Sequence, residues 1–466
     1  MTISDMDQMR DWLIRQLWYG DKSRALEQVD VDHLMGLELG SGSISLMLLT
    51  CHYGDGSTSA YFAPTQGQGA ARSGGGAADV QDAFSSTEFL GWLYSGFHDG
   101  RSLAASGGRS MRWIAGAGSS PLPGETPSAR LLQGEQSNTS VRFGDTAILK
   151  VFRKVQSGTN PDPEILRFLS GHTAYRHAPA DLGTIELHAA GSSEPVVIAA
   201  MQGFVPNRGD AWGWLLGALR SRREKRPGLL DQIALLAQRT GDLHLALATP
   251  SADPAFSVER IGARYRKRLH ERVDIELHWT MDAVLAANLR SGAQLSDLRD
   301  RLATVLAQHE VLDGLPLFRV HGDYHLGQVL RTDRDFIIID FEGEPSRSFE
   351  ERREKASPLK DVAGMVRSLD YAFASARAQS PERKDGPPLA GLTDLAQEAQ
   401  QVYIAAYVGS VTRENGTMIP PDAGKFSTAL SIYLIEKALY EVRYELDNRP
   451  DWTEIPLQAL EALVAT

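Results

Sequence analysis

The sequence contains a single cysteine, Cys51, among 466 residues, and it has fewer basic than acidic side chains, 48 Lys and Arg against 59 Asp and Glu. A lone cysteine forms neither an internal disulfide nor a cysteine-based zinc site. The formal net charge of −11 argues against non-specific binding to nucleic acid or to an anionic membrane, because both require clustered Lys and Arg. A phosphate-bearing ligand must therefore be held by a local group of charges.

Long apolar runs are missing as well. The longest ones, such as residues 44–51, contain Ser and Thr and are far shorter than the ~20 residues that span a bilayer. The first residues, MTISDMDQMRDW, lack the basic and apolar regions of a signal peptide. We therefore expect a cytoplasmic protein without a membrane-spanning segment.

The N-terminal part predicts a small unit with one hairpin. Apolar residues alternate in residues 41–54 and 57–64, on either side of Asp55-Gly56, which is the pattern of a β-hairpin with a tight turn. The sequence SSTEFLGWLYSGF has a Ser/Thr start, an early glutamate and apolar residues at helical spacing, so it predicts a helix. Residues 64–79 consist mainly of Gly, Ala and Gln and predict a mobile loop.

We expect three parts along the chain. A stretch rich in Gly, Pro and Ser, residues 116–129, is the predicted seam after an N-terminal cap subdomain of residues 1–115. The runs ARLLQGEQ, NTSVRF and TAILKVF predict an antiparallel meander, and with one helix and two further strands they form a β-rich lobe of residues 116–206. In residues 207–466 apolar side chains recur every 3.6 residues, so this part is mainly helical, apart from one hairpin in residues 328–345.

This order of elements indicates the fold class. A β-rich lobe followed by a helical lobe with an embedded hairpin is typical of a bilobal, eukaryotic-protein-kinase-like α+β fold. Order alone is weak evidence for function, which must be argued from particular residues.

The strongest chemical signal is HGDYHLGQ, residues 321–328, followed by IIIDFE, residues 337–342. Phosphoryl transfer from ATP requires a carboxylate that accepts the proton of the acceptor hydroxyl, and oxygen ligands for Mg²⁺. The two ends of a hairpin lie side by side, so the side chains there converge. We therefore expect Asp323 to be the catalytic base, and Gln328 and Asp340 to bind Mg²⁺.

This motif has two other interpretations. His321 and His325, four residues apart, have the spacing of a helical metal pair, and Asp323 is a residue type that caps turns. A metal pair needs a third ligand and a helix, and Gly322 and Gly327 disfavour a helix. In catalytic loops of the kinase type the first histidine braces the loop by hydrogen bonds, so phosphoryl transfer is the favoured interpretation.

A second element is Ala-Ile-Leu-Lys, residues 147–150, which is similar to the kinase strand whose lysine contacts the α- and β-phosphates of ATP. Glu164 opens the next helix and would pair with Lys150, orienting its ammonium toward the phosphates. Taken alone, an apolar strand with a lysine is more often an exposed sheet edge. The HGD and DFE motifs downstream favour the ATP-binding role.

The segment GEQSNTS, residues 134–140, stands where protein kinases have a glycine-rich loop. It matches neither GxGxxG nor GxxxxGK[ST], which excludes a Rossmann site and a P-loop. Gln136, Ser137 and Asn138 at a hairpin tip would let backbone N–H groups approach phosphates, as an anion nest does. The alternative is an ordinary polar turn.

Together these residues resemble the actinobacterial maltokinases and glucosamine kinases, a branch of the aminoglycoside phosphotransferase-like sugar kinases. The resemblance covers nearly the whole chain, through GEQSNTSVRFGDTAILKVFRKV, HGDYHLGQVLRT, DFEGEP, SPLKDVAGMVRSLDYA and YLIEKALYEVRYELDNRPDW. It implies an aminoglycoside phosphotransferase-like fold with an N-terminal cap, ATP as co-substrate and Mg²⁺ as cofactor. It also implies a glutamine, here Gln328, where most relatives carry Asn as the second metal ligand.

The substrate-side motifs depart from the maltokinase pattern. The usual RQRWFAGK reads RQLWYGDK in residues 15–22, and the helix usually written YELDKAVYE reads YLIEKALYE in residues 433–441. In maltokinases that helix resembles a sugar-contacting element, so the resemblance implies that the substrate is bound by Asp323, His325, Glu436, Lys437, Tyr440 and Glu441. The alternative for the two glutamates is a solvated helix face.

We therefore expect an ATP-dependent sugar kinase that binds a small-molecule sugar or amino sugar. Phosphorylation of glucosamine at O6 is the first choice, because carboxylates stand where an ammonium could be met, and maltose phosphorylated at O1 is the runner-up. A protein or lipid kinase would need an APE-type activation segment, which the sequence lacks. A nucleotide-binding pseudokinase typically loses the base, the strand lysine or the metal aspartate, and all three are present.

Overall fold

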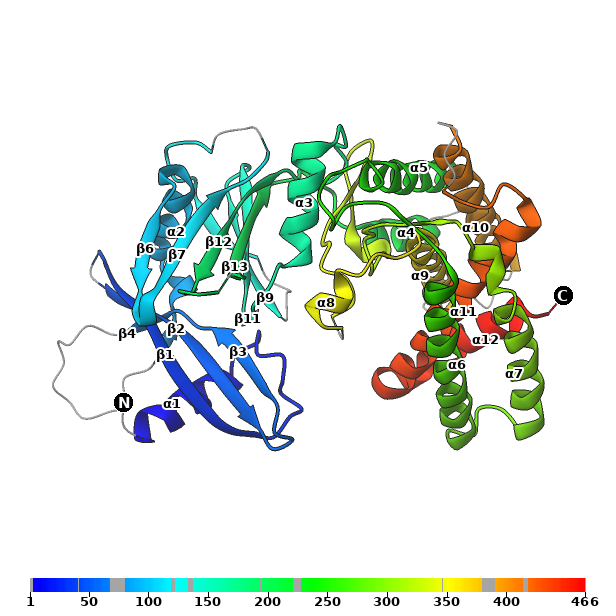
Figure 1. Cartoon of the computed structure of the whole chain (residues 1–466), viewed down its shortest axis with the longest axis horizontal. Coiled ribbons are helices and arrows are strands. Elements are labelled where there is room, and N and C mark those ends of the chain that lie inside the picture. Colours follow the sequence, from blue (N-terminus) through cyan, green and yellow to red (C-terminus); the bar gives the residue numbers. More distant parts are fainter. Residues whose placement is uncertain are drawn as a thin grey trace. The chain divides into compact units, whose positions relative to one another are not determined.

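The computed structural model describes residues 3–40, 42–67, 80–118, 122–132, 137–192, 194–220, 228–345, 347–378, 390–413 and 418–465. They form two compact units (Figure 1). The first contains Met1–Gly171 and Pro179–Pro206, and the second contains His172–Ala178 and Asn207–Thr466.

The first unit begins with the cap sheet. Helix α1 (Ile3–Ile14) precedes the strands β1 (Leu26–Leu39), β2 (Gly42–Tyr53) and β3 (Thr58–Phe62). The antiparallel pairing of β2 with β3 confirms the predicted hairpin. β1 pairs with β2 on its other side, and β11 (Lys154–Val155) adds to β3, so residues far apart in the sequence complete this sheet.

Two segments of the cap differ from the sequence prediction. β1 was not predicted, although Val29 and Val31 alternate with acidic residues as in a half-exposed strand. Thr65–Gly67, which belongs to the predicted mobile loop 64–79, forms strand β4 and pairs with β2 and with β5 (Gln81–Asp82). The loop prediction is therefore wrong for β4, because sheet pairing supplies the order that composition alone does not. Residues 68–79 lie outside the described residues.

The second sheet of this unit has the strand order β6-β7-β12-β13-β10-β9-β8. The predicted meander is confirmed as β8, β9 and β10, each antiparallel to the next. The two predicted helices and the two further strands are confirmed as α2, α3, β12 and β13, whereas β6 and β7 were not predicted. Their bounds are α2 (Thr87–Asp99), β6 (Ser102–Ala105), β7 (Arg109–Ala115), β8 (Ala129–Leu131), β9 (Asn138–Phe143), β10 (Ala147–Phe152), α3 (Pro161–His172), β12 (Asp181–His188) and β13 (Val196–Gly203).

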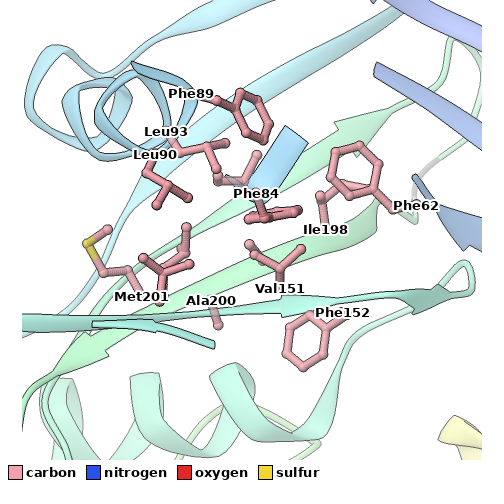
Figure 2. Packing of buried hydrophobic residues seen from close by; sticks show 14 of the residues in the cluster. Phe62, Phe84, Phe89, Leu90, Leu93, Val151, Phe152, Ile198, Ala200 and Met201 are labelled. Carbon is pink, nitrogen blue, oxygen red and sulfur yellow. The ribbon is translucent and has the colours of Figure 1, made fainter. Parts of the chain in front are cut away.

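The core of the first unit runs through both sheets. A continuous cluster of buried apolar side chains contains Leu34 and Phe62 of the cap sheet together with Val151 and Ile198 of the second sheet. Figure 2 shows Leu90 and Leu93 of α2 facing this cluster. β6 and β7, which precede residue 116, pair into the same sheet as β12. This sheet therefore contains strands from both sides of the predicted cap boundary at residue 115, and that boundary remains a prediction.

The second unit is mainly helical, as predicted. The predicted hairpin in residues 328–345 is confirmed as the antiparallel pair of β16 (Val329–Arg331) and β17 (Phe336–Ile338). Among the described helices none is long and apolar enough to cross a bilayer. The other elements are α4 (Ala211–Arg220), α5 (Leu229–Leu247), β14 (Glu259–Arg260), α6 (Ala263–Ala286), α7 (Gly292–Leu306), β15 (Pro316–Leu317), α8 (Phe349–Arg352), α9 (Leu359–Ala378), α10 (Ala390–Val411), α11 (Ala423–Asn448) and α12 (Glu454–Leu463).

Candidate active site

The loop before β16 is held in place by a buried carboxylate on α9. Asp361, which is 1% exposed, accepts hydrogen bonds from the backbone N–H groups of His321 and Gly322, at 2.9 Å each. His244 Nε2 lies 3.1 Å from the same carboxylate. Burial acts to raise the pKa of Asp361, but the His244 contact and the loop N–H groups outweigh it and lower that pKa. Asp361 therefore fixes the start of the HGD motif as an ionised group.

The two histidines of the motif shape the loop. His321 is buried, and its Nε2 donates to the carbonyl of Ile339, 2.9 Å away, which ties the loop to the end of β17. His325 Nδ1 accepts the N–H of Gly327 at 3.1 Å, which leaves the ring proton on Nε2 when the imidazole is neutral. Residues 321–325 form a loop rather than a helix, so the two histidines lack the helical spacing of a metal pair, which disfavours that interpretation.

Asp323 stands at the tip of this loop with oxygens that remain available. Its carboxylate receives no hydrogen bond from the described residues. Two longer contacts orient it: Lys437 Nζ lies 3.7 Å from Oδ1, and His325 Nε2 lies 3.9 Å from Oδ2. A carboxylate with unfilled acceptor sites beside a cation is suited to accept the proton of a hydroxyl group.

Gln328 and Asp340 meet across the β16–β17 hairpin, as the spacing of the motifs predicts. Gln328 Nε2 donates to Asp340 Oδ2 at 2.7 Å, so its amide oxygen remains as a possible ligand. Asp340 has a φ of 65°, in the left-handed region that is uncommon for a non-glycine residue and that occurs at functional sites. This strained backbone sets the direction of the Asp340 side chain.

The ligands around Asp340 fit a magnesium ion. A carboxylate oxygen of Asp340 and one of Glu342 lie within 4.8 Å of each other, and the amide of Gln328 lies beside them. These are hard oxygen ligands, which Mg²⁺ prefers, and no sulfur or imidazole ligand is needed. When bound, Mg²⁺ would neutralise charge on the phosphates.

A small pocket in the same unit is lined in part by Lys437, whose Nζ lies 3.7 Å from Asp323. It has a volume of about 30 Å³, and its lining comes from α11, α9 and the segment after β17. The lining residues are Glu344, Arg347, Lys360, Tyr433, Glu436, Lys437 and Tyr440. Three of the six residues predicted to bind the substrate, Glu436, Lys437 and Tyr440, are thus brought together around one hollow.

The glutamates predicted to meet an ammonium already have cationic neighbours. Arg272 on α6 donates to Glu436 at 2.7 Å, and Arg367 on α9 donates to Glu441 at 2.8 Å. The alternative of a solvated helix face does not describe them, because their side chains are only 15% and 12% exposed. Glu441 does not line the pocket described above.

Glu344 is a buried carboxylate that lies among three cationic side chains. It is 6% exposed, accepts a hydrogen bond from Arg347, and lies 3.8 Å from the Nζ atoms of Lys360 and Lys437. Burial acts to raise the pKa of Glu344, but these three cations outweigh it and lower that pKa to about 2. Glu344 therefore remains ionised and holds the surrounding cations.

The residues that the sequence predicts to bind ATP, on and around the strand that carries Lys150, belong to the first unit. Lys150 on β10 is 9% exposed, so it is not the exposed edge lysine of the alternative interpretation. Its Nζ lies 3.7 Å from Asp162 on α3, two residues before the predicted partner Glu164. Asn138 opens β9 and pairs with Phe152, and Ser137 is exposed next to it. Gln136 lies outside the described residues.

Several site residues were missed by the sequence analysis. Asp361 and Glu344 lie within motifs that the resemblance quotes, SPLKDVAG and DFEGEP, yet nothing in their spacing showed that they are buried partners. Gly364 carries a weak signal of close packing, because a Cβ there would come within 2.6 Å of the Tyr324 carbonyl oxygen. α9 consequently packs directly on the catalytic loop.

The β-rich unit with a strand lysine, the braced HGD loop and the Gln328–Asp340 hairpin define the class of an aminoglycoside phosphotransferase-like kinase. The sequence matches the phosphotransferase enzyme family over residues 128–343 and the maltokinase N-terminal cap domain over residues 12–99. The chain is similar to this family, and within it to the branch that contains maltokinases and glucosamine kinases. It is a phosphotransferase with ATP as co-substrate and Mg²⁺ as cofactor.

Known relatives cover most of the chain. A glucosamine kinase of Streptacidiphilus jiangxiensis is 27% identical over 353 residues, 74% of this chain and 75% of the relative. A glucosamine kinase of Mycolicibacterium smegmatis is 27% identical over 334 residues, 71% of this chain and 78% of the relative. A solved glucosamine kinase in complex with glucosamine, ADP and inorganic phosphate has a TM-score of 0.70 at 21% identity, covering 97% of this chain and 98% of the other. This last likeness shows the shared fold.

Proposed function

We propose that the protein is an ATP-dependent glucosamine kinase that forms glucosamine 6-phosphate. The observation that carries the proposal is that two curated relatives spanning more than 70% of the chain are glucosamine kinases. The cap match leaves maltose, phosphorylated at O1, as the second candidate acceptor. A regulatory pseudokinase is disfavoured, since Asp323, Lys150 and Asp340 are all present.

In the proposed reaction Asp323 accepts the proton of the O6 hydroxyl while that oxygen attacks the γ-phosphorus of ATP. The bond between the γ-phosphorus and its bridging oxygen breaks, and ADP leaves with the electron pair. Gln328 and Asp340 would hold Mg²⁺, and Lys150 would contact the α- and β-phosphates. Phosphoryl transfer depends on positioning and charge, so these few groups suffice.

The direct test is an ATP-consumption screen on the purified protein. Glucosamine, maltose, glucose and an aminoglycoside are offered separately at equal concentration with Mg²⁺ and ATP. The proposal expects the highest kcat/KM for glucosamine and a product that carries the phosphate on O6, checked by NMR. Efficient use of maltose with no use of glucosamine would replace the proposal by the maltokinase alternative.

The amino group of the acceptor can be tested through Glu436 and Glu441. Replacing either by glutamine keeps the shape and removes the charge, and we expect the KM for glucosamine to rise roughly tenfold because a charge-assisted hydrogen bond contributes about 1.5–3 kcal/mol. The KM for a neutral sugar should change less. Since each glutamate also holds an arginine, the melting temperature of each variant is the control. Equal changes for both sugars would mean that these residues do not meet the amine.

The remaining predictions concern the surroundings of the enzyme. A cytoplasmic location and the absence of nucleic-acid or membrane partners follow only from the composition and are part of this proposal. They can be checked by fractionating cells that express the tagged protein and by a vesicle and DNA binding assay at low salt. Co-sedimentation with anionic vesicles would contradict them.

A further inference from the structure

The ammonium of Lys437 lies between two carboxylates that come from distant parts of the chain. Its Nζ is 3.7 Å from Asp323 Oδ1 in the HGD loop and 3.8 Å from Glu344 Oε1 after β17, while Lys437 itself is on α11. The nearly equal distances mean that the charge is shared between the two acids. The side chain is 21% exposed, so solvent only partly screens these contacts.

Lys437 is the main cation that orients Asp323. Among the described residues, no group donates a hydrogen bond to the Asp323 carboxylate, and the other charged or titratable neighbour within ion-pair distance is His325. Burial lowers the pKa of His325, so its imidazole is neutral at physiological pH and contributes no full charge. Among the described residues, Lys437 is thus the permanently charged cation within ion-pair distance of Asp323, while the guanidinium of Arg352 interacts with this carboxylate at longer range.

Lys437 is itself fixed from two sides. Glu344 holds it while also contacting Arg347 and Lys360, and the ring of Tyr440, one turn along α11, lies 5.1 Å from Nζ. Burial acts to lower the pKa of Lys437, but Asp323, Glu344 and Glu441 outweigh it and raise that pKa. Its ammonium therefore remains protonated and has little freedom to swing away from the loop.

We propose that Lys437 is a positioning residue for the catalytic base, whose ammonium holds Oδ1 of Asp323 so that the free lone pairs of this carboxylate receive the acceptor hydroxyl, with Glu344 as the anchor of the ammonium. The inference rests on the proposed function, in which Asp323 is the base. It assigns Lys437 to the chemistry of the base, in place of the substrate contact that the resemblance implies.

The test separates a role through Asp323 from sugar binding and from folding. In Lys437→Met we expect kcat to fall by about 10- to 100-fold, a part of the 10²–10⁴ that a general base contributes, with the KM for ATP and for the sugar within threefold. Lys437→Arg should recover part of the lost kcat. The matched control is Lys425→Met, an exposed lysine in the first turn of the same helix, which should leave kcat and the melting temperature unchanged.

A double-mutant cycle with Asp323 gives the decisive result. If Lys437 acts through the base, the variant Asp323→Asn combined with Lys437→Met loses no more activity than Asp323→Asn alone. Losses that multiply, or a raised sugar KM with unchanged kcat in Lys437→Met, would overturn the inference. Glu344→Gln provides a second readout, since it should lower kcat severalfold with Lys437 intact. A wild-type protein that phosphorylates none of the offered sugars would instead refute the proposed function.

Discussion

Asp82 in the first unit and Asp323 in the second have the same side-chain exposure, 21%, and both lie beside cations. Their contacts are different. Asp82 accepts hydrogen bonds from Trp18 Nε1 at 3.0 Å, Arg153 Nη2 at 2.6 Å and the Phe84 backbone N–H at 3.1 Å. Within the described part of the chain, Asp323 accepts no hydrogen bond and has ion-pair contacts of 3.7 Å and 3.9 Å. A carboxylate whose acceptor sites are filled serves the fold, whereas one with open sites remains available to a substrate.

The largest expected effect concerns Asp323, whose carboxylate accepts no hydrogen bond from the described residues. Asp323→Asn removes the proton acceptor with little change in shape, so kcat should fall on the order of 10²–10⁴. The melting temperature should change by no more than a few degrees, because no hydrogen bond from a described residue is lost and Glu344 still pairs with Lys437 when the 3.7 Å contact with Asp323 is weakened. Steady-state kinetics and a thermal scan check the two parts together. Turnover within threefold of wild type would remove Asp323 as the base.

For Asp82, whose acceptor sites are filled, we predict the reverse: a loss of stability with little change in kcat. Asp82→Ala leaves the guanidinium of Arg153, which is 1% exposed between the rings of Trp18 and Phe84, without its ion-pair partner. Breaking a buried ion pair costs about 3–5 kcal/mol, so the protein should unfold at markedly lower denaturant concentration. At a temperature where the variant is folded, its kcat should remain within threefold. Arg112→Ala on the exposed face of β7 is the control.

Asp361 lies between these two extremes. Its acceptor sites are filled like those of Asp82, but it is 1% exposed and its bonds fix the loop that carries Asp323. Asp361→Asn keeps the volume and weakens bonds to three donors, so we expect a stability loss of about 1.5–3 kcal/mol together with a kcat loss of about tenfold from a displaced loop. A change in stability with normal kcat would show that the loop holds its shape without this carboxylate.

Much of the fold was predictable because its signals are local. The turn at Asp55-Gly56, the meander and the hairpin of β16 and β17 each depend on residues next to one another in the sequence. β4 was not predictable in this way, since Thr65 and Gln66 gain order by pairing with the distant strands β2 and β5. Composition describes what a segment can bury by itself and misses what a neighbouring strand supplies.

The site was predictable where one loop and one hairpin supply all the parts. Gln328 and Asp340 converge because the hairpin brings its ends together, and the structure places their side chains 2.7 Å apart. The partners from other elements were not predictable. Asp162 beside Lys150, Asp361 beneath the loop and Arg272 beside Glu436 each depend on how one helix packs, which periodicity does not specify.

The smallest expected effect concerns the cap carboxylate Asp21, and it depends on pH. Burial acts to raise the pKa of Asp21, but hydrogen bonds from Tyr61, Lys154 and Tyr53 outweigh it and lower that pKa from 3.8 to about 2. A depressed pKa in the folded state means that the stabilisation is fully present above about pH 4 and is lost as the pH falls toward 2.

Asp21→Asn should therefore lower the melting temperature by a few degrees at pH 7 and make it less sensitive to acid than the wild type between pH 4 and pH 2. The difference between the two proteins should shrink as the pH falls through this window, because protonated Asp21 resembles the amide. Kinetic constants for ATP and sugar at pH 7 should be unchanged, since Asp21 contacts Tyr53, Tyr61 and Lys154 within the first unit. Parallel melting curves across the window would show that the carboxylate of Asp21 does not stabilise the cap through its charge.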